Sequence, residues 1–112
     1  MGRKREYYKW QIPGSVVAIV ESLCADYERR KAVISMGGAE ETVLAEYRRL
    51  NDIIDAALED VEQGVRKYML CDVANHSGYV LSQASLFFAK NTYYARKRKL
   101  VHDIAAGLKL IE

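Results

Sequence analysis

Apolar residues in the first third of the chain recur at helical spacing. They follow one another at steps of four, three, four and seven, and Ile19 and Cys24 widen the stripe. The stripe itself consists of Val16, Val20, Leu23, Tyr27 and Ile34. The only proline, Pro13, stands where it can begin a helix, and the Gly37-Gly38 pair offers the left-handed backbone that ends one. The pattern predicts one long helix from Ser15 to near Met36.

A second apolar stripe begins just after these glycines. Glu40 and Glu41 fall in the first turn of the helix it predicts, where the backbone dipole favours negative charge. Its members step by four and three: Val43, Tyr47, Leu50, Ile54, Ala57 and Val61. Such a narrow seam requires a neighbouring helix, and the short loop makes the first helix that neighbour. Ile53, Leu58 and Val65 broaden the seam enough to indicate contact with more than one helix, and Gly64 marks a bend or break.

Three further helices are expected beyond Gly64. Residues 66–75 continue as helix and end at 76–78, where His76 is expected to cap the helix end. Residues 81–89 form a short apolar helix, Lys90-Asn91 a tight turn, and Thr92 onward a basic helix. This order is typical of a helix-turn-helix. Because there is no strand pattern, we predict an all-α fold in which a long N-terminal helical hairpin precedes a C-terminal helix-turn-helix.

The basic helix is the most informative segment. Residues 90–99 contain five cations around a tyrosine pair. Thr92 or Asn91 is expected to cap its N-terminus. An apolar face is expected to hold the helix against the core. Arg96, Lys99 and part of Lys97 and Arg98 would then point outward. The apolar face comprises Tyr94, Val101, Ile104, Ala105 and Leu108. A DNA-recognition helix needs this arrangement, although a solvated basic face at a domain end has the same pattern.

Charge is unevenly distributed along a chain that is almost balanced at +2. Residues 1–34 carry +3, residues 35–65 carry −6 and residues 66–112 carry +5. This polarity would orient the molecule on DNA with the acidic middle held away from phosphates, unless the middle is simply an exposed acidic helix. With 112 residues, half of them apolar, we expect one compact unit with an N-terminal arm (1–14), a helical hairpin (15–65) and a DNA-binding region (66–112).

Other classes of function find little support in the sequence. Apolar runs are too short for a membrane span or a secretory signal, so we expect a soluble cytoplasmic protein. Cys24 and Cys71 are expected to be buried thiols in a reducing compartment. His76 and His102 lack metal-ligand spacing, and no serine has the surroundings of a nucleophile. We therefore expect no enzymatic activity, no metal and no cofactor.

Three segments together resemble a known family. They are Asp26 to Lys31 (DYERRK), Leu50 to Leu58 (LNDIIDAAL) and Asn91 to Ala105 (NTYYARKRKLVHDIA). The layout resembles bacteriophage transcriptional regulators of the RinA/ArpU type, whose C-terminal half is similar to the region-4 helix-turn-helix of sigma factors. The resemblance implies a phage- or prophage-encoded, sequence-specific DNA-binding regulator of transcription.

The resemblance also implies which residues contact DNA. It places Thr92 and Tyr93 at the start of the recognition helix, and Arg96 and Lys99 toward the groove. Arginine is the better candidate for reading a guanine, whereas lysine mostly supplies charge to phosphates. The full set of expected DNA-binding residues is Lys90, Asn91, Thr92, Tyr93, Arg96, Lys97, Arg98 and Lys99.

Two other functions remain open, and each predicts a different partner. A small DNA-packaging recognition subunit would use the same helix-turn-helix but assemble into a ring. A helical protein-interaction module would use the basic patch to meet an acidic partner. The regulator is expected to be a homodimer that binds double-stranded DNA, with RNA polymerase as a further partner. The basic N-terminal residues Arg3-Lys4-Arg5 could serve it as an additional DNA-contacting arm.

Overall fold

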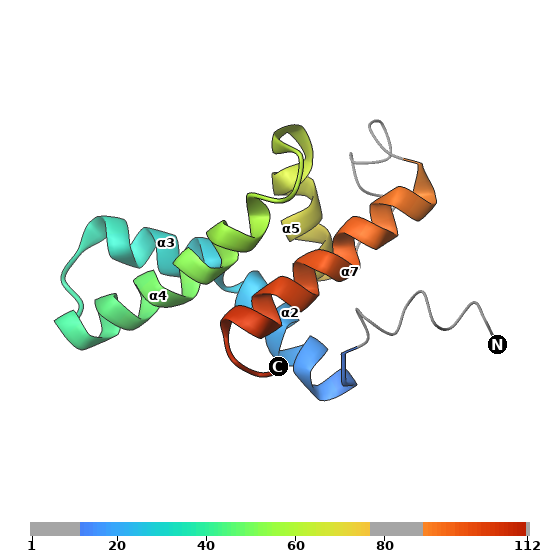
Figure 1. Ribbon diagram of the computed structural model, residues 1–112. Helices are drawn as coiled ribbons and strands as arrows, with labels where there is room; N and C mark the ends of the chain where they lie inside the picture. The colour runs from blue at the N-terminus through green and yellow to red at the C-terminus, as the bar shows by residue number, and fades with distance from the viewer. Residues whose placement is uncertain (1–11, 77–88, 112) are drawn as a thin grey trace.

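A computed structural model describes residues 12–76 and 89–111, and the secondary structure of this part of the chain consists of helices joined by short loops, without strands (Figure 1). The expected all-α class is therefore confirmed for it. The elements in chain order are α2 (Gly14–Ala25), α3 (Tyr27–Met36), α4 (Glu41–Leu58), the short 3-10 helix η1 (Gln63–Val65), α5 (Arg66–Asn75) and α7 (Lys90–Gly107). The expected N-terminal arm up to residue 11 and nearly all of the expected short helix 81–89 lie outside the described residues. No described helix combines the length and the apolar character needed to cross a bilayer.

The first helix is not continuous, contrary to the prediction. Asp26, with φ −98° and ψ 3°, separates α2 from α3. The carbonyl of Leu23, in the last turn of α2, accepts a hydrogen bond of 2.6 Å from the Arg30 guanidinium, which satisfies an acceptor that a helix end leaves open. The apolar pattern did not register this break because the two halves keep a similar spacing while they pack on different partners: α2 on α5 and α7, α3 on α4.

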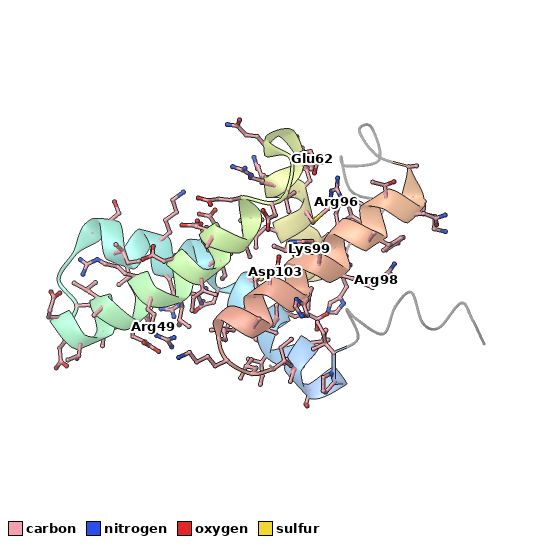
Figure 2. The ribbon with its side chains drawn as sticks, in the orientation of Figure 1. Arg49, Glu62, Arg96, Arg98, Lys99 and Asp103 are labelled. Atoms are coloured by element: carbon pink, nitrogen blue, oxygen red, sulfur yellow. The ribbon has the colours of Figure 1, made fainter. Side chains whose placement is uncertain are left out.

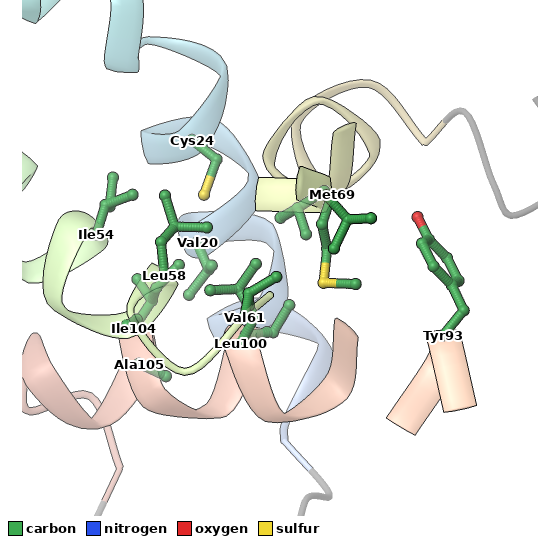
Figure 3. Close-up of a cluster of buried hydrophobic side chains, with 14 residues drawn as sticks. Val20, Cys24, Ile54, Leu58, Val61, Met69, Tyr93, Leu100, Ile104 and Ala105 are labelled. Carbon is green, nitrogen blue, oxygen red and sulfur yellow. The ribbon is translucent and has the colours of Figure 1, made fainter. Parts of the chain in front are cut away.

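One apolar core joins α2, the C-terminal part of α4, α5 and α7 (Figure 3). Its members come from both sides of position 65, so the expected hairpin and DNA-binding regions share it. Several side chains in it are completely buried, including Val20, Met69 and Ile104. Cys24 also lies in this core, and burial raises the pKa of its thiol to about 12. We call these elements, residues 12–25, 53–76 and 89–111, the body.

The remaining described residues, 26–52, form a second region that we call the arm. Here α3 packs against the first part of α4, and the hairpin projects from the body, so that the molecule measures 52 × 32 × 20 Å (Figure 1). Gly37 and Gly38 connect the two helices with φ angles of 70° and 89°, the left-handed backbone expected for them. Since α4 contacts both α3 and α7, the expected contact with more than one helix is confirmed.

A polar cluster holds the base of the arm. Arg30 is 1% exposed, and its Nε donates to Asn51 Oδ1 at 2.8 Å. Asn51 Nδ2 donates to the backbone carbonyl of Tyr27 at 3.3 Å. Where the sequence pattern expected a purely apolar seam between the first two helices, a charged side chain and an amide lie at the centre of the contact.

Helix ends agree with expectation at α5 and differ at α7. The break expected at Gly64 lies between Leu58 and Arg66. His76 ends α5 with φ 56°, the left-handed conformation of a C-cap. Helix α7 begins at Lys90 behind Ala89 and has no side-chain cap, so the expected turn at Lys90-Asn91 and the expected cap at Thr92 or Asn91 are wrong. Lys90, Asn91 and Thr92 already belong to the first turn of α7.

Candidate nucleic-acid interface

The apolar face of α7 fixes the helix to the body. Leu100, Val101, Ile104 and Ala105 are all buried, as predicted for all but Leu100. At the N-terminal end the prediction is wrong by one position, because Tyr93 is completely buried whereas Tyr94 is only partly buried. A periodic pattern alone cannot decide which member of a tyrosine pair points inward.

Tyr93 belongs to a buried polar contact between α5 and α7. Its hydroxyl donates to a carboxylate oxygen of Asp72, which is itself 0% exposed. The other oxygen of Asp72 accepts a hydrogen bond from Lys97 Nζ at 3.1 Å. Two of the expected DNA-binding residues, Tyr93 and Lys97, therefore donate their hydrogen bonds to Asp72 within the protein. We remove both from the candidate interface, because separating Lys97 would leave a buried carboxylate without its cation.

Arg96 and Lys99 lie on the side of α7 that faces the chain segment after α4 (Figure 2). Arg96 donates to Glu62, with Nη2 and Oε2 2.9 Å apart. Lys99 Nζ lies 2.9 Å from Asp60 and 2.7 Å from Asp103. The hydrogen bond from Arg96 lowers the pKa of Glu62, and the two carboxylates raise the pKa of Lys99, Asp103 contributing more than Asp60.

These carboxylates belong to an acidic connector, which we define as residues 59–62, with side chains Glu59, Asp60 and Glu62. The connector is firmly seated, because Val61 is only 3% exposed and Arg66 Nε donates to its carbonyl at 2.8 Å. Arg66 also reaches the carbonyl of Glu59, at 3.2 Å. We expected the acidic middle of the chain to lie away from the basic helix. Its C-terminal end lies against it instead, since Val61 belongs to the same core as α7.

The other candidate residues remain at the surface to differing degrees. Lys90, Asn91 and Thr92 are exposed on the first turn of α7. Arg98 is partly buried and lies on the other side of α7 from Arg96 (Figure 2). The structure thus places Thr92, Arg96 and Lys99 on one side of α7. Lys90 and Asn91 lie on the exposed first turn of the same helix, and Arg98 lies on another side from Arg96.

A shallow groove of about 350 Å³ runs between α4 and α7 beside Lys99. Ile53, Ala56 and Ala57 contribute apolar lining, and the Lys99 ion pairs form its charged part. Gly107 lets the two helices approach, because a Cβ atom there would lie 2.7 Å from Ile53 Cγ2. The close approach holds the C-terminal half of α7 against α4.

The remaining chemistry-bearing side chains do not gather into a site. His76 lies 3.4 Å from Glu21, and His102 lies 3.2 Å from Asp103. Within residues 12–76 and 89–111, no group of three or more histidine, cysteine or acidic side chains is placed to hold a metal ion. Cys71 is exposed, so the expectation that both cysteines are buried is wrong for this one.

Comparison of the chain with protein-family models, with curated protein sequences and with solved structures finds no match in any of the three. The resemblance to RinA/ArpU-type regulators therefore stays a prediction that depends on the three sequence segments alone.

Proposed function

We propose that the protein binds double-stranded DNA through the exposed side of α7 and regulates transcription, as a phage- or prophage-type regulator acting in the cytoplasm. The observation that carries the proposal is the placement of Thr92, Arg96 and Lys99. Steps of four and three put them on one helix face, and the buried residues Val101 and Ala105 hold the opposite side of the same helix. A rigid helix with a cationic outer face suits the reading of phosphates and base edges.

The ion pairs with the acidic connector are compatible with this proposal on energetic grounds. The side chains of Arg96 and Glu62 are 40% and 47% exposed. Surface ion pairs of this kind contribute about 0–1 kcal/mol. A DNA phosphate can replace Glu62 as the partner of Arg96. When a protein cation binds the phosphate, counterions leave the DNA, and their release favours this exchange at low salt.

Binding to duplex DNA as a function of salt concentration tests the proposal. We expect the affinity of the wild-type protein to fall steeply with salt. Arg96→Ala should cost about 1–3 kcal/mol and relax base preference at one position, whereas Lys99→Ala should weaken binding to all sequences alike and reduce the salt slope by about 1. Arg48→Ala, which removes an exposed cation of the arm, is the matched control and should leave binding unchanged.

Selection of bound fragments from random duplex DNA would then show whether binding is specific. As a homodimer the protein would place two α7 helices on half-sites about 34 Å apart, so a palindromic site is expected. A large ring in a native mass measurement would favour a DNA-packaging subunit instead. RNA polymerase is the further partner we propose for the regulator, tested by co-purification on promoter DNA.

A protein-interaction module is the second candidate function. It stays open because one observation weighs against DNA binding: Arg96, Lys97 and Lys99 all pair with carboxylates of the same chain. If this candidate is right, the wild-type protein and Arg96→Ala should both bind every duplex with the same negligible affinity, and that affinity should not depend on salt.

A further inference from the structure

We infer that the acidic connector is a built-in competitor of DNA: Glu62 and Asp60 occupy, in the free protein, the cations of α7 that phosphates would otherwise contact. This inference rests on the proposed function and concerns the regulation of the same site. In this inference the carboxylates of the connector oppose DNA binding, whereas the cations of α7 that they face promote it.

The geometry of the pairs carries the first step. Glu62 places both carboxylate oxygens near Arg96, at 3.2 and 3.3 Å from Nε and 2.9 Å from Nη2. This is the fork arrangement in which a guanidinium also holds a phosphate. Asp60 contacts Lys99 at 2.9 Å. Each carboxylate thus stands where a phosphate oxygen would have to be.

The anchoring of the connector carries the second step. Val61 and Val65 are 3% and 1% exposed, and Arg66 donates to the carbonyls of Glu59 and Val61. The backbone between the two acidic side chains is therefore held in the core. When Arg96 turns to a phosphate, the charge of Glu62 stays close by and repels that phosphate, so DNA binding is opposed both by the ion pair and by the remaining charge.

The charge balance of the surface carries the third step. Among the described residues, the carboxylates that pair with Arg96 and Lys99 are Glu62, Asp60 and Asp103, the last from α7 itself. Three described carboxylates thus surround these two cations and weaken their attraction for phosphates. Neutralising Glu62 or Asp60 removes one of these negative charges and should increase the affinity for DNA, whereas loss of an acidic group elsewhere should not.

The experiment compares Glu62→Gln with Glu59→Gln at low salt, using fluorescence anisotropy with a labelled random-sequence duplex. Both substitutions remove one charge from the same connector, but only Glu62 contacts α7, since Glu59 has no ion pair with a described residue. We expect Glu62→Gln to bind up to about fivefold more tightly than wild type, the upper ratio that corresponds to a surface ion pair. Glu59→Gln should change affinity by less than half as much, and the gain should shrink as salt rises.

A double-mutant cycle shows whether Glu62 acts through Arg96. In an Arg96→Ala background, Glu62→Gln should give no more gain than Glu59→Gln does. Asp60→Asn is an independent probe through Lys99 and keeps the inference testable if Glu62→Gln impairs folding, which circular dichroism would reveal.

The outcomes separate this inference from the proposed function. If wild type binds duplex with the expected salt slope but neither Glu62→Gln nor Asp60→Asn binds more tightly than Glu59→Gln, the competitor role is overturned and DNA binding stands. If no variant binds any duplex, including Asp60→Asn/Glu62→Gln, both proposals fail. Binding by Glu62→Gln where wild type binds only weakly supports both.

Discussion

The body and the arm are both built from α-helices, but different interactions hold their helices together. In the body, side chains such as Met69 and Ile104 are completely buried among other apolar groups. In the arm, the contact between α3 and α4 centres on the hydrogen bonds of Arg30 and Asn51. The body also contains a buried charged group, Asp72, but most of its buried side chains are apolar. A buried polar group left without its partner is costly, so the contact in the arm requires each partner in place. We therefore expect the body to set the overall stability and the arm to depend on one polar cluster.

The largest effect is expected from Ile104→Ala in the body. Ile104 is 0% exposed, and truncation of a fully buried isoleucine costs about 3–4 kcal/mol through lost burial and the cavity left behind. Leu44→Ala is the counterpart in the arm, where Leu44 is 7% exposed, and should cost about 2 kcal/mol. Urea denaturation followed by circular dichroism measures both. Equal losses would contradict the division between the two regions.

Arg30→Ala should follow, at about 2–3 kcal/mol, because it leaves the Asn51 side chain and the Leu23 carbonyl without their hydrogen-bond partner. The loss should be concentrated in the arm. Amide hydrogen exchange is expected to accelerate in α3 and the first half of α4 while α5 and α7 keep their protection.

Replacing both partners sharpens this test. Arg30→Met/Asn51→Leu removes the polar groups together and should recover part of the stability lost in Arg30→Ala. If the double variant is as unstable as Arg30→Ala, the loss in Arg30→Ala does not come from polar groups left without a partner.

Gly107→Ala probes the contact through which α4 meets the body. The added Cβ would meet Ile53 Cγ2 at 2.7 Å, and overpacking of this kind costs about 1–3 kcal/mol. Alanine's better helix propensity offsets up to about 1 kcal/mol of it. The thermal midpoint should fall modestly in the wild-type background, and in an Ile53→Ala background the same substitution should be neutral or stabilising.

The smallest effect is expected from Glu46→Gln on the surface of the arm. Arg49 lies 2.8 Å from Glu46 and its hydrogen bond lowers the pKa of that carboxyl below the ordinary value of 4.5. Any contribution of the pair is thus present above pH 4.5 and is lost as pH falls through the folded-state pKa. At pH 7 the urea midpoint of Glu46→Gln should equal that of wild type, in contrast to Arg30→Ala. A clear loss at pH 7 would show that exposed charges also hold the arm.

Local signals predicted much of the fold. Gly37 and Gly38 marked the turn of the arm, and the stripe through Val101 and Ile104 identified the buried face of α7. The break at Asp26 was missed, because no proline or glycine accompanies it and its cause is packing on different neighbours. The Arg30–Asn51 contact was missed because it joins side chains 21 residues apart, which spacing within one helix cannot reveal.

The candidate site was less predictable than the fold. Spacing placed Arg96 and Lys99 on the outer side of α7, but the pairing of Arg96 with Glu62 spans 34 residues. The alternation of acidic and basic segments was the one available signal, but we interpreted it as a polarity that holds the acidic middle away from DNA, and it does not indicate where the two segments meet. The family resemblance assigned Tyr93 to DNA contact, and the apolar stripe was assigned to Tyr94. The structure instead buries Tyr93 in the core, where its hydroxyl donates to Asp72.

The projection of the arm has an evolutionary consequence. Its tip, around Gly37 and Gly38, lies far from α5 and α7 (Figure 1). A change in the length of the hairpin there would therefore not disturb the packing of the body. Inserting seven residues into each of α3 and α4 would preserve the facing sides and lengthen the hairpin by about 10 Å, at 1.5 Å per residue. The hairpin could therefore gain reach by such an insertion while the helices of the body keep their length.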